Sequence, residues 1–544
     1  MLPKMIYGAN IAKQPQTAFG GLDMRLSSGN GLIRHMSNLT GDYAPVLATR
    51  RERWKVATLE KPNGLFAAGK LFWVDGETLY ADGEAVGNVA DNRKLFCALG
   101  ERVVIWPDKM IYTLDGVLES LEARYCASGL VFGNGTYADE TAEANSITTT
   151  GDAFPFRPGD AVTISGCTVC PENNKTIIVR EISEDGKTLR FYENSFTMTS
   201  EESEDEATGE TVTTYAESVT ETGEVELART APDLDYLCEH ENRLWGGKGD
   251  TIWCCKLGDP YNWNVFDGVS TDAWSVDMGS AGVLTGCTAF LGYPIFMKEG
   301  KVYKVYGSKP TNYELLSSAT LGTVDDGGSS YGVAGETLFY LSRAGIVAYS
   351  GGIPSIVSEA LGEMQLVKAV GGSDGLKYYC SATDTEGGAH LLVYDAQKGL
   401  WHREDGLQAA YMAYLDGLYA LCENGELWLL GNPAAVPEGA EAEGSFESEA
   451  VFGDWDWNSM DSKFPTRLRL RLETDEGTTL AVQISYDGGD WETAATAGAG
   501  RKRNWYLPVP IRRCDHYKLR IAANGPWKLF ALEHEFYSGS GSRK

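Results

Sequence analysis

A hairpin-like unit recurs along this chain. Each copy has a short apolar strand, a Gly or Asp turn, and a second strand that ends near an aromatic residue. The copies are Gly64–Gly83, Cys97–Gly116, Leu237–Gly258, Cys287–Gly307, Val333–Gly352, Gly372–Trp401 and Tyr411–Gly431. The last five begin 39–50 residues apart. This spacing is typical of the four-stranded blades of a β-propeller.

A closed ring of such blades solves a problem that isolated hairpins have. A lone hairpin is marginally stable in water, and an open sheet exposes unpaired N–H and C=O groups along its edges. We therefore predict an all-β protein built on a β-propeller of about 6–8 blades. Aromatic residues of the units, Trp73, Trp245, Tyr303, Tyr340 and Trp428, are expected to fill the layers between blades.

Two segments interrupt the repeat and define the predicted domains. Residues 145–234 read as an inserted small β-barrel-like domain, with the alternating strand FRPGDAVTIS and a hairpin across Glu184–Gly186. Within it, Glu201–Glu226 holds ten acidic residues and no basic one, which predicts a solvated loop. Residues 433–463 begin rich in Pro, Gly, Ala and Glu and are predicted to be a linker. The propeller then comprises residues 1–144 and 235–432.

The last predicted domain, residues 464–544, is a C-terminal β-sandwich with a basic strand. The sequence RLRLRL at 467–472 alternates strictly, so its arginines share one face and its leucines the other. This domain holds 13 Lys and Arg against nine Asp and Glu. Contact with an acidic partner, either a neighbouring subunit or a phosphate backbone, is predicted for Arg467, Arg469, Arg471, Arg501, Lys502, Arg503, Arg512 and Arg513. An ordinary solvated strand face remains the alternative.

The charge of the whole chain argues against a general nucleic-acid-binding protein. The formal net charge is -29, whereas binding to phosphate backbones needs basic surface. No apolar run is long enough for a signal peptide or a membrane span. The 11 cysteines follow no framework and are expected to be reduced thiols in a protein made in a cytoplasm.

Motifs for catalysis, metal binding or cofactor binding are not found. Cys167 and Cys170 form a single CxxC pair, whereas structural zinc usually takes four ligands. The six histidines show no HExxH spacing, and there is no GxSxG elbow, GxGxxG loop or Walker loop. We therefore predict no catalytic, metal or cofactor site and no enzymatic activity. A glycosidase site remains an alternative, because its two carboxylates can be far apart in the sequence and come together only in the fold.

One segment carries a resemblance to a known family. The stretch Glu241–Gly268 resembles the "NRLW … GDPxNW" segment of bacteriophage tail-nozzle and packaged-DNA-stabilisation proteins, from phages and prophages of gut Firmicutes. The matching residues are Asn242, Arg243, Leu244, Trp245, Gly258, Asp259, Pro260, Asn262 and Trp263. A looser likeness includes Phe19–Gly31 and Arg512–Ile521.

The resemblance implies a structural virion protein of a phage tail, assembled in the host cytoplasm. Such proteins form ring oligomers, commonly hexamers, and contact other tail or portal and adaptor proteins. As a nozzle, plug or head-to-tail connection, the ring would retain packaged DNA and release it at ejection. The main alternative is a glycan-binding or glycan-cleaving tail protein for host-surface recognition, and a cellular peptide-binding scaffold is a third reading.

Overall fold

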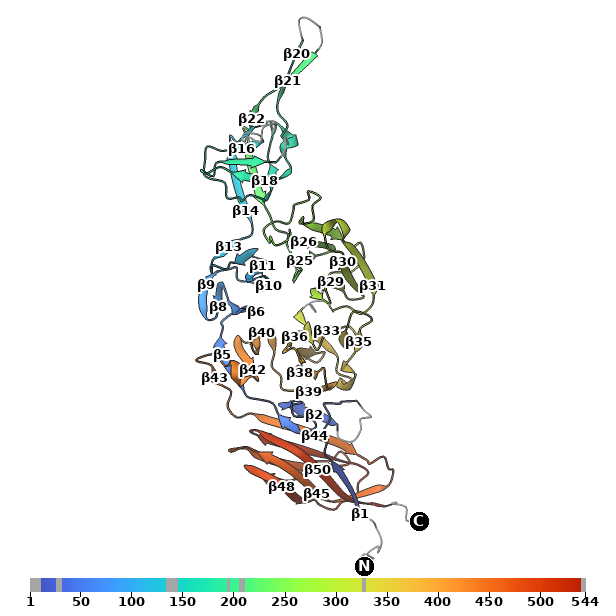
Figure 1. Ribbon diagram of the computed structural model, residues 1–544. Helices are drawn as coiled ribbons and strands as arrows, with labels where there is room; N and C mark the ends of the chain where they lie inside the picture. The colour runs from blue at the N-terminus through green and yellow to red at the C-terminus, as the bar shows by residue number, and fades with distance from the viewer. Residues whose placement is uncertain are drawn as a thin grey trace, which may run out of the picture. The chain divides into compact units, whose positions relative to one another are not determined.

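The structure is a computed structural model that describes residues 11–25, 32–133, 145–192, 196–204, 211–324 and 329–539 (Figure 1). Regular structure in these ranges consists of β-strands and short 3₁₀ turns. The predicted fold class is confirmed: the chain is all-β and of the β-propeller class. It divides into two compact units, unit 1 (Met1–Gly76, Tyr80–Gly83 and Thr320–Lys544) and unit 2 (Glu77–Leu79 and Glu84–Ala319).

Unit 1 contains three antiparallel sheets of propeller type, of which the first two are meanders. They comprise β32 (Gly332–Ala334), β33 (Thr337–Ser342), β34 (Gly345–Tyr349) and β35 (Ser355–Ile356); β36 (Leu366–Ser373), β37 (Lys377–Asp384), β38 (Ala389–Asp395) and β39 (Leu400–Arg403); and β40 (Ala409–Tyr414), β41 (Leu418–Cys422) and β42 (Glu426–Leu430) with β5 (Arg53–Thr58) and β43 (Glu441–Ala442). Neighbouring sheets pack through their faces. Phe339 stacks on Tyr378 with ring centroids 5.3 Å apart, and Val370 shares a core with Ala409.

Unit 2 contains three more sheets of this kind. They are β10 (Leu95–Leu99), β11 (Arg102–Trp106), β12 (Met110–Tyr112) and β13 (Leu118–Ser120); β24 (Tyr236–His240), β25 (Arg243–Lys248), β26 (Thr251–Cys254) and β27 (Trp274–Asp277); and β28 (Gly286–Phe290), β29 (Tyr293–Lys298), β30 (Lys301–Tyr306) and β31 (Glu314–Ala319). Trp106 meets Trp263 edge to face at 5.9 Å. Cys238 and Cys287, on adjacent sheets, bring their Sγ atoms to 3.1 Å.

Each predicted hairpin unit contributes to its own sheet. The first unit lies in the sheet of β6 (Pro62–Ala68), β7 (Lys70–Asp75), β8 (Thr78–Ala81) and β9 (Glu84–Asn88), whose residues are divided between the two units. The predicted packing role of the aromatic residues is also seen. Trp245, Tyr303 and Tyr340 are buried, and the half-buried Trp73 and Trp428 pack against the cores of their sheets.

The inserted domain begins earlier than predicted. Its strands are β14 (Ala123–Ser128), β15 (Val131–Gly133), β16 (Ser146–Thr148), β17 (Ala161–Ser165), β18 (Thr176–Ile182), β19 (Thr188–Phe191), β22 (Ser218–Thr220) and β23 (Glu224–Arg229). β14 pairs with β23 over its whole length, and Phe132 of β15 is buried in the core of the insert. The boundary at residue 145 is therefore corrected to about residue 123, because both strands are needed to complete the insert.

The acidic segment of the insert is also corrected, since much of it forms strands. β20 (Ser200–Glu204) pairs with β21 (Thr211–Tyr215), while residues 205–210 lie outside the described residues. The carboxylate of Glu221 accepts hydrogen bonds from the backbone N–H groups of Thr168, Val169 and Cys170, each at 2.9 Å. Burial acts to raise the pKa of Glu221, but these donors outweigh it and the pKa is lowered. Glu221 is thus a structural anion that fixes the turn containing Cys167 and Cys170.

The C-terminal β-sandwich is confirmed as a fold, but it recruits strands from outside residues 464–544. One sheet has the order β3 (Leu39–Thr40), β4 (Leu47–Thr49), β50 (Trp527–Gly539), β45 (Ser462–Thr474) and β48 (Gly500–Pro508), with β1 (Ile11–Gln16) also on β50. The other is β2 (Ile33–Ser37), β44 (Glu447–Trp455), β49 (Tyr517–Asn524), β46 (Thr479–Tyr486) and β47 (Glu492–Ala497). The leucines of the RLRLRL strand are buried in the core that the two sheets share.

Two predicted domain boundaries are wrong because the sandwich includes strands from outside residues 464–544. The region 433–463 is not a linker throughout, because β44 lies inside it and alternates buried and outward-facing residues. Residues 11–49 were assigned to the propeller, yet β1 to β4 pair with strands of the sandwich. In both regions the pairing partner is distant in sequence, so local composition did not identify it.

The residues of the NRLW and GDPxNW motif form a buried scaffold in unit 2. Asn242 has φ 59°, which shapes the turn between β24 and β25, and the N–H of Gly258 donates to its carbonyl at 2.8 Å. Leu244, Trp245 and Trp263 are buried. The Trp263 indole N–H donates to the carbonyl of Pro260 at 2.9 Å, and Asp259 accepts from the Asn262 amide at 2.7 Å.

Asn262 also joins the motif to the insert, which gives a first prediction. Its Oδ1 accepts from the N–H of Ala161 at 2.9 Å, and its Nδ2 donates to Asp160 at 3.1 Å. Asn262→Ala would leave a buried N–H without a partner, so we expect the free energy of unfolding to fall by about 1–3 kcal/mol. Hydrogen exchange should show the loss of protection first around Ala161. Unchanged exchange there would contradict this role.

Candidate functional site

The basic residues predicted to contact a partner lie on two neighbouring strands and on the connection that follows them. Arg467, Arg469 and Arg471 lie along β45 and Arg501 lies on β48, whereas Arg512 and Arg513 lie in the connection between β48 and β49. Lys502 and Arg503 are also in β48, but their side chains lie outside the described ones.

Several of these residues already have partners on the same domain. Arg469 pairs with Glu533 at 2.6 Å and lies over the Tyr506 ring at 4.6 Å, and Arg467 lies 3.7 Å from Glu535. Arg501 lies 3.7 Å from Glu473, and Arg512 pairs with Glu492. Much of the predicted positive charge is thus neutralised locally. A partner at this face stays a prediction.

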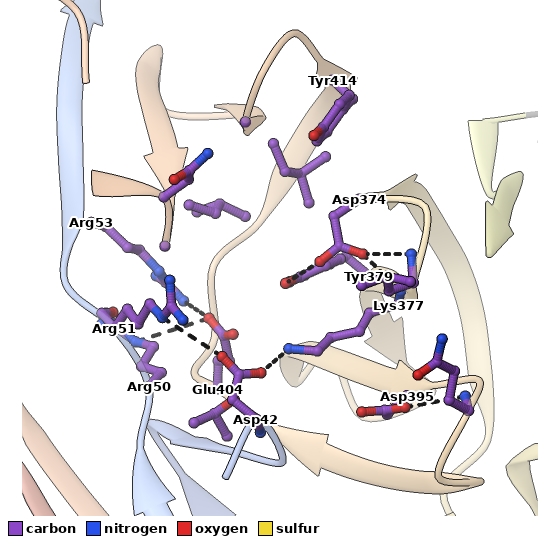
Figure 2. Close-up of a pocket in the computed structure, with 18 of the residues that line it drawn as sticks. Asp42, Arg50, Arg51, Arg53, Asp374, Lys377, Tyr379, Asp395, Glu404 and Tyr414 are labelled. Carbon is purple, nitrogen blue, oxygen red and sulfur yellow. Dashed lines mark hydrogen bonds and ion pairs between the residues drawn. The ribbon is translucent and has the colours of Figure 1, made fainter. Parts of the chain in front are cut away.

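A pocket of about 470 Å³ in unit 1 is lined by several charged residues (Figure 2). It lies where three successive hairpins turn, between β36 and β37, between β38 and β39, and between β40 and β41. The segment from Thr40 to Arg53, Glu404 and the residues from Leu430 to Asn432 supply the remaining wall. Turns at the same end of neighbouring sheets commonly carry binding residues, because the sheets hold them rigidly.

Short local hydrogen bonds fix the turns. Asp374 accepts from the backbone N–H groups of Leu376 at 2.9 Å and Lys377 at 2.7 Å, and the Tyr379 hydroxyl lies 3.3 Å from its other oxygen. Asp395 accepts in the same way from the N–H of Lys398 at 3.0 Å. These are Asx turns, so both aspartates serve the backbone.

A buried ion network closes the base of the pocket. Arg53 donates to Glu404 at 2.7 Å and to Asp405 at 2.6 Å. Arg50 binds both oxygens of Glu443 at 2.7 Å and lies 4.0 Å from Glu404. The two arginine side chains are only 3% and 4% exposed. Because each guanidinium is paired with carboxylates in the protein, this network is structural support for the pocket.

Asp42 and Lys377 form an ion pair at the side of the pocket (Figure 2). Burial acts to raise the pKa of Asp42, but the charge and hydrogen bond of Lys377 outweigh it and lower the pKa. Asp42 is therefore an ionised anchor for Lys377. A general acid of a glycosidase instead needs a raised carboxyl pKa.

The side chains at the opening of the pocket differ from those at its base. Arg51 is 49% exposed and contacts Asp42 only at 3.8 Å through Nε. The Lys398 side chain is 34% exposed, and its ammonium lies 3.0 Å from Asp395 and donates to the carbonyl of Gly41 at 2.8 Å. Tyr414 and Leu376 are 51% and 55% exposed. The opening thus carries two partly exposed cations, of which Arg51 is the more exposed, and Tyr414 and Leu376 line the same pocket.

No sequence motif marks this pocket. Asp42, Arg51, Lys377, Tyr379 and Tyr414 belong to no motif and come from distant parts of the chain. The sequence signal that could have indicated the pocket is the position of Asp374, Asp395 and Asp416 in the turns of three consecutive hairpins. Among the described residues no group of three or more His, Cys, Asp or Glu side chains is placed to hold a metal ion.

Comparisons with known proteins give structural similarities alone. No protein-family model and no curated protein matches the sequence. Similar solved structures include an exo-β-1,3-galactanase from Phanerochaete chrysosporium, with 12% identity, 54% of this chain and 92% of that chain covered, and a TM-score of 0.20. The phage phi92 endosialidase has 10% identity, 82% and 65% coverage and a TM-score of 0.21. The dihydro-heme d1 dehydrogenase NirN has 12% identity, 69% and 81% coverage and a TM-score of 0.27.

These comparisons correct the prediction that the chain is not an enzyme. The galactanase and the endosialidase are glycan-cleaving enzymes by name, and another similar structure is named a glycoside hydrolase, at 13% identity over 94% of this chain. The prediction that the chain is not an enzyme is withdrawn. Among the described residues there is no helix with the length and apolarity to cross a membrane.

Proposed function

We propose that this protein binds an acidic glycan in the pocket of unit 1. The observation that carries the proposal is that the partly exposed cations Arg51 and Lys398 and the exposed Tyr414 line one pocket, Arg51 with no ion-pair partner among the described residues nearer than Asp42 at 3.8 Å. A sugar that carries a carboxylate combines the two features that this opening recognises, an anionic group and an apolar ring face.

The geometry fits such a ligand in size and chemistry. Small-molecule sites usually enclose about 300–1,000 Å³, and this pocket holds about 470 Å³. The planar guanidinium of Arg51 can donate two parallel hydrogen bonds to a carboxylate. The Tyr414 ring can stack on the C–H face of a sugar while its hydroxyl stays in water. Three lining carboxylates are paired with cations, Glu404 with Arg53, Asp42 with Lys377 and Asp395 with Lys398, which reduces their repulsion of an anion.

Calorimetric titration with carboxylated oligosaccharides tests this function. We expect binding of at least one of oligosialic acid, oligogalacturonate and hyaluronan oligomers, and loss of binding when its carboxyl groups are reduced to alcohols. Arg51→Gln should weaken the affinity about 10- to 100-fold, because a charge-assisted hydrogen bond pair is lost. Tyr414→Ala should weaken it about 3- to 10-fold.

Matched controls separate the pocket from general surface charge. Arg501→Gln and Tyr506→Ala change an exposed arginine and an exposed tyrosine of the sandwich, and both should leave the affinity unchanged. Equal binding of the reduced oligosaccharides, or equal affinity of Arg51→Gln, would overturn the proposal. Mass spectrometry of the glycan after incubation shows whether the bound chain is also cleaved.

A structural tail role is a second candidate, favoured by the row of Arg467, Arg469 and Tyr506 on the outer face of the sandwich. The family resemblance implies a virion ring that retains DNA, and a glycan site would suit the same location. Particle imaging of the purified chain tests this candidate. We expect homogeneous rings, which Arg467→Glu together with Arg469→Glu should disperse. Persistent monomers of the unchanged protein would contradict it.

A further inference from the structure

A second hollow in unit 2 carries two exposed aromatic rings. It encloses about 510 Å³ and is lined by residues of β18 and by Tyr192, Asn264, Phe266 and Asp267. Tyr192 is 58% exposed and Phe266 is 61% exposed. Large apolar side chains gathered at one hollow of a surface commonly mark a binding site.

Phe266 is presented to solvent by an ordered loop. Trp263 and Val265 on the same loop are buried. The N–H of Ala273 donates to the carbonyl of Val265 at 3.0 Å, and Asp272 accepts from the N–H groups of Gly268 at 2.6 Å and Val269 at 3.0 Å. These hydrogen bonds hold the backbone on both sides of Phe266, so the loop presents its side chain at a defined place on the surface.

The insert supplies the other ring and the floor of the hollow. Tyr192 follows directly after β19, and the Arg180 guanidinium lies 5.9 Å from the centre of its ring. Thr176, Ile177 and Ile178 of β18 also line the hollow, and the Thr176 hydroxyl lies 2.9 Å from that of Thr163. The hollow therefore combines ring faces and aliphatic groups with an amide, a carboxylate and a hydroxyl.

We propose that this hollow, named here the Tyr192–Phe266 site, binds a neutral saccharide. Sugar rings present C–H faces that stack on aromatic rings, and hydroxyls that bond to amide and carboxylate oxygens such as those of Asn264 and Asp267. None of the described lining residues is cationic, and Asp267 is acidic, so an anionic sugar is disfavoured. The site thus selects a different sugar class from the pocket of unit 1, and it stands whether or not that pocket binds a glycan.

Saturation-transfer NMR and calorimetry with defined neutral oligosaccharides test the site. The probes are cellotetraose, maltotetraose and tri-N-acetylchitotriose, titrated against the full chain carrying Arg51→Gln so that the pocket of unit 1 is disabled. We expect at least one probe to bind, and Tyr192→Ala and Phe266→Ala each to weaken it about 3- to 10-fold. Phe266→Tyr keeps the ring and should retain the affinity.

Tyr215→Ala is the matched control, because Tyr215 is also in the insert and 67% exposed but does not line the hollow. It should leave binding unchanged. Failure of all three probes to bind would overturn the proposal, as would undiminished binding by the double variant of Tyr192 and Phe266. A change of oligomeric state in that double variant, without sugar binding by the parent, would instead identify the aromatic pair as a protein interface. Binding of these probes with no binding of acidic glycans would leave this site standing and refute only the proposed function of unit 1.

Discussion

Lowering the pH from 7 to 4 is expected to remove about 6 kcal/mol from the free energy of unfolding of unit 1, through two buried histidines. Burial lowers the pKa of His402 to about 3, with Lys377 adding to the effect while Asp42 and Asp395 oppose it. Burial likewise lowers the pKa of His534 to about 3. Both ring nitrogens of His402 and Nε2 of His534 have no hydrogen-bond partner in the described structure.

The direction follows from where each state takes up protons. In the unfolded chain a histidine has a pKa of about 6.5, so it becomes charged as the pH falls below that value. In the folded protein both rings stay neutral down to about pH 3. The unfolded state therefore binds more protons between about pH 6.5 and pH 3, and folding stability is lost progressively through that window. Each histidine accounts for roughly 3 kcal/mol at pH 4.

Urea unfolding followed by tryptophan fluorescence at pH 7.0, 5.5 and 4.0 measures this effect. His402→Leu and His534→Phe should each remove roughly 3 kcal/mol of the acid-dependent loss, because neither replacement can be protonated. Burial also lowers the pKa of His35, so both variants keep the loss that His35 contributes. Asp42 and Asp405, whose pKa values are lowered by their cationic neighbours, add a further loss only near and below their unfolded pKa of 3.8. His516→Gln, at a histidine whose side chain is 30% exposed, is the control. An unchanged pH dependence in the double variant would refute the role of the two rings.

Replacing Arg243 by methionine is expected to destabilise unit 2 by about 3–5 kcal/mol. Arg243 is 2% exposed, and its guanidinium donates to the carbonyls of Cys255 at 2.9 Å, Asp272 at 2.6 Å and Ser270 at 2.8 Å. Methionine fills a similar volume but donates no hydrogen bond. Three carbonyls would then lose their donor, and each unsatisfied buried group costs about 1–3 kcal/mol.

Thermal and urea unfolding of the full chain measure the change. Arg243→Lys should fall between the parent and Arg243→Met, since an ammonium can reach some of the same carbonyls. Arg124→Met removes an arginine whose side chain is 69% exposed and should change stability little. A loss below about 1 kcal/mol for Arg243→Met would show that the loop from Ser270 to Asp272 is held by other contacts.

The propeller sheets were predictable because their paired strands and the turns that join them are close together in the sequence. Units such as Val333–Gly352 contain both strands of a hairpin and the turn between them, so alternation and turn residues identify the sheet. The RLRLRL strand was predictable for the same reason, because one face of β45 is buried and the other is not. The NRLW motif also marked a buried structural scaffold, with Arg243 at its centre.

Features that depend on distant pairing were not predictable. β44 was not predicted because it follows a Pro-rich and Gly-rich segment, and its partner β49 lies about 70 residues later. β14 was assigned to the propeller because only its pairing with β23 shows that it belongs to the insert. The pocket of unit 1 depends on the meeting of Asp42 with Lys377, which are 335 residues apart. Single-sequence patterns contain no signal for such a contact.

The strands from the first sixty residues find their partners near the other end of the chain. β1 and β4 pair with β50, β2 pairs with β44, and β5 completes the sheet of β40 to β42. At a synthesis rate of about 5–20 residues per second, these segments leave the ribosome long before their partners exist. During that interval their exposed backbone edges are open to pairing with other chains. The backbone edges of β1 and β4 are therefore covered only after β50 has been synthesised. A nascent chain that stops before β50 would leave these edges open to chaperones or to neighbouring copies.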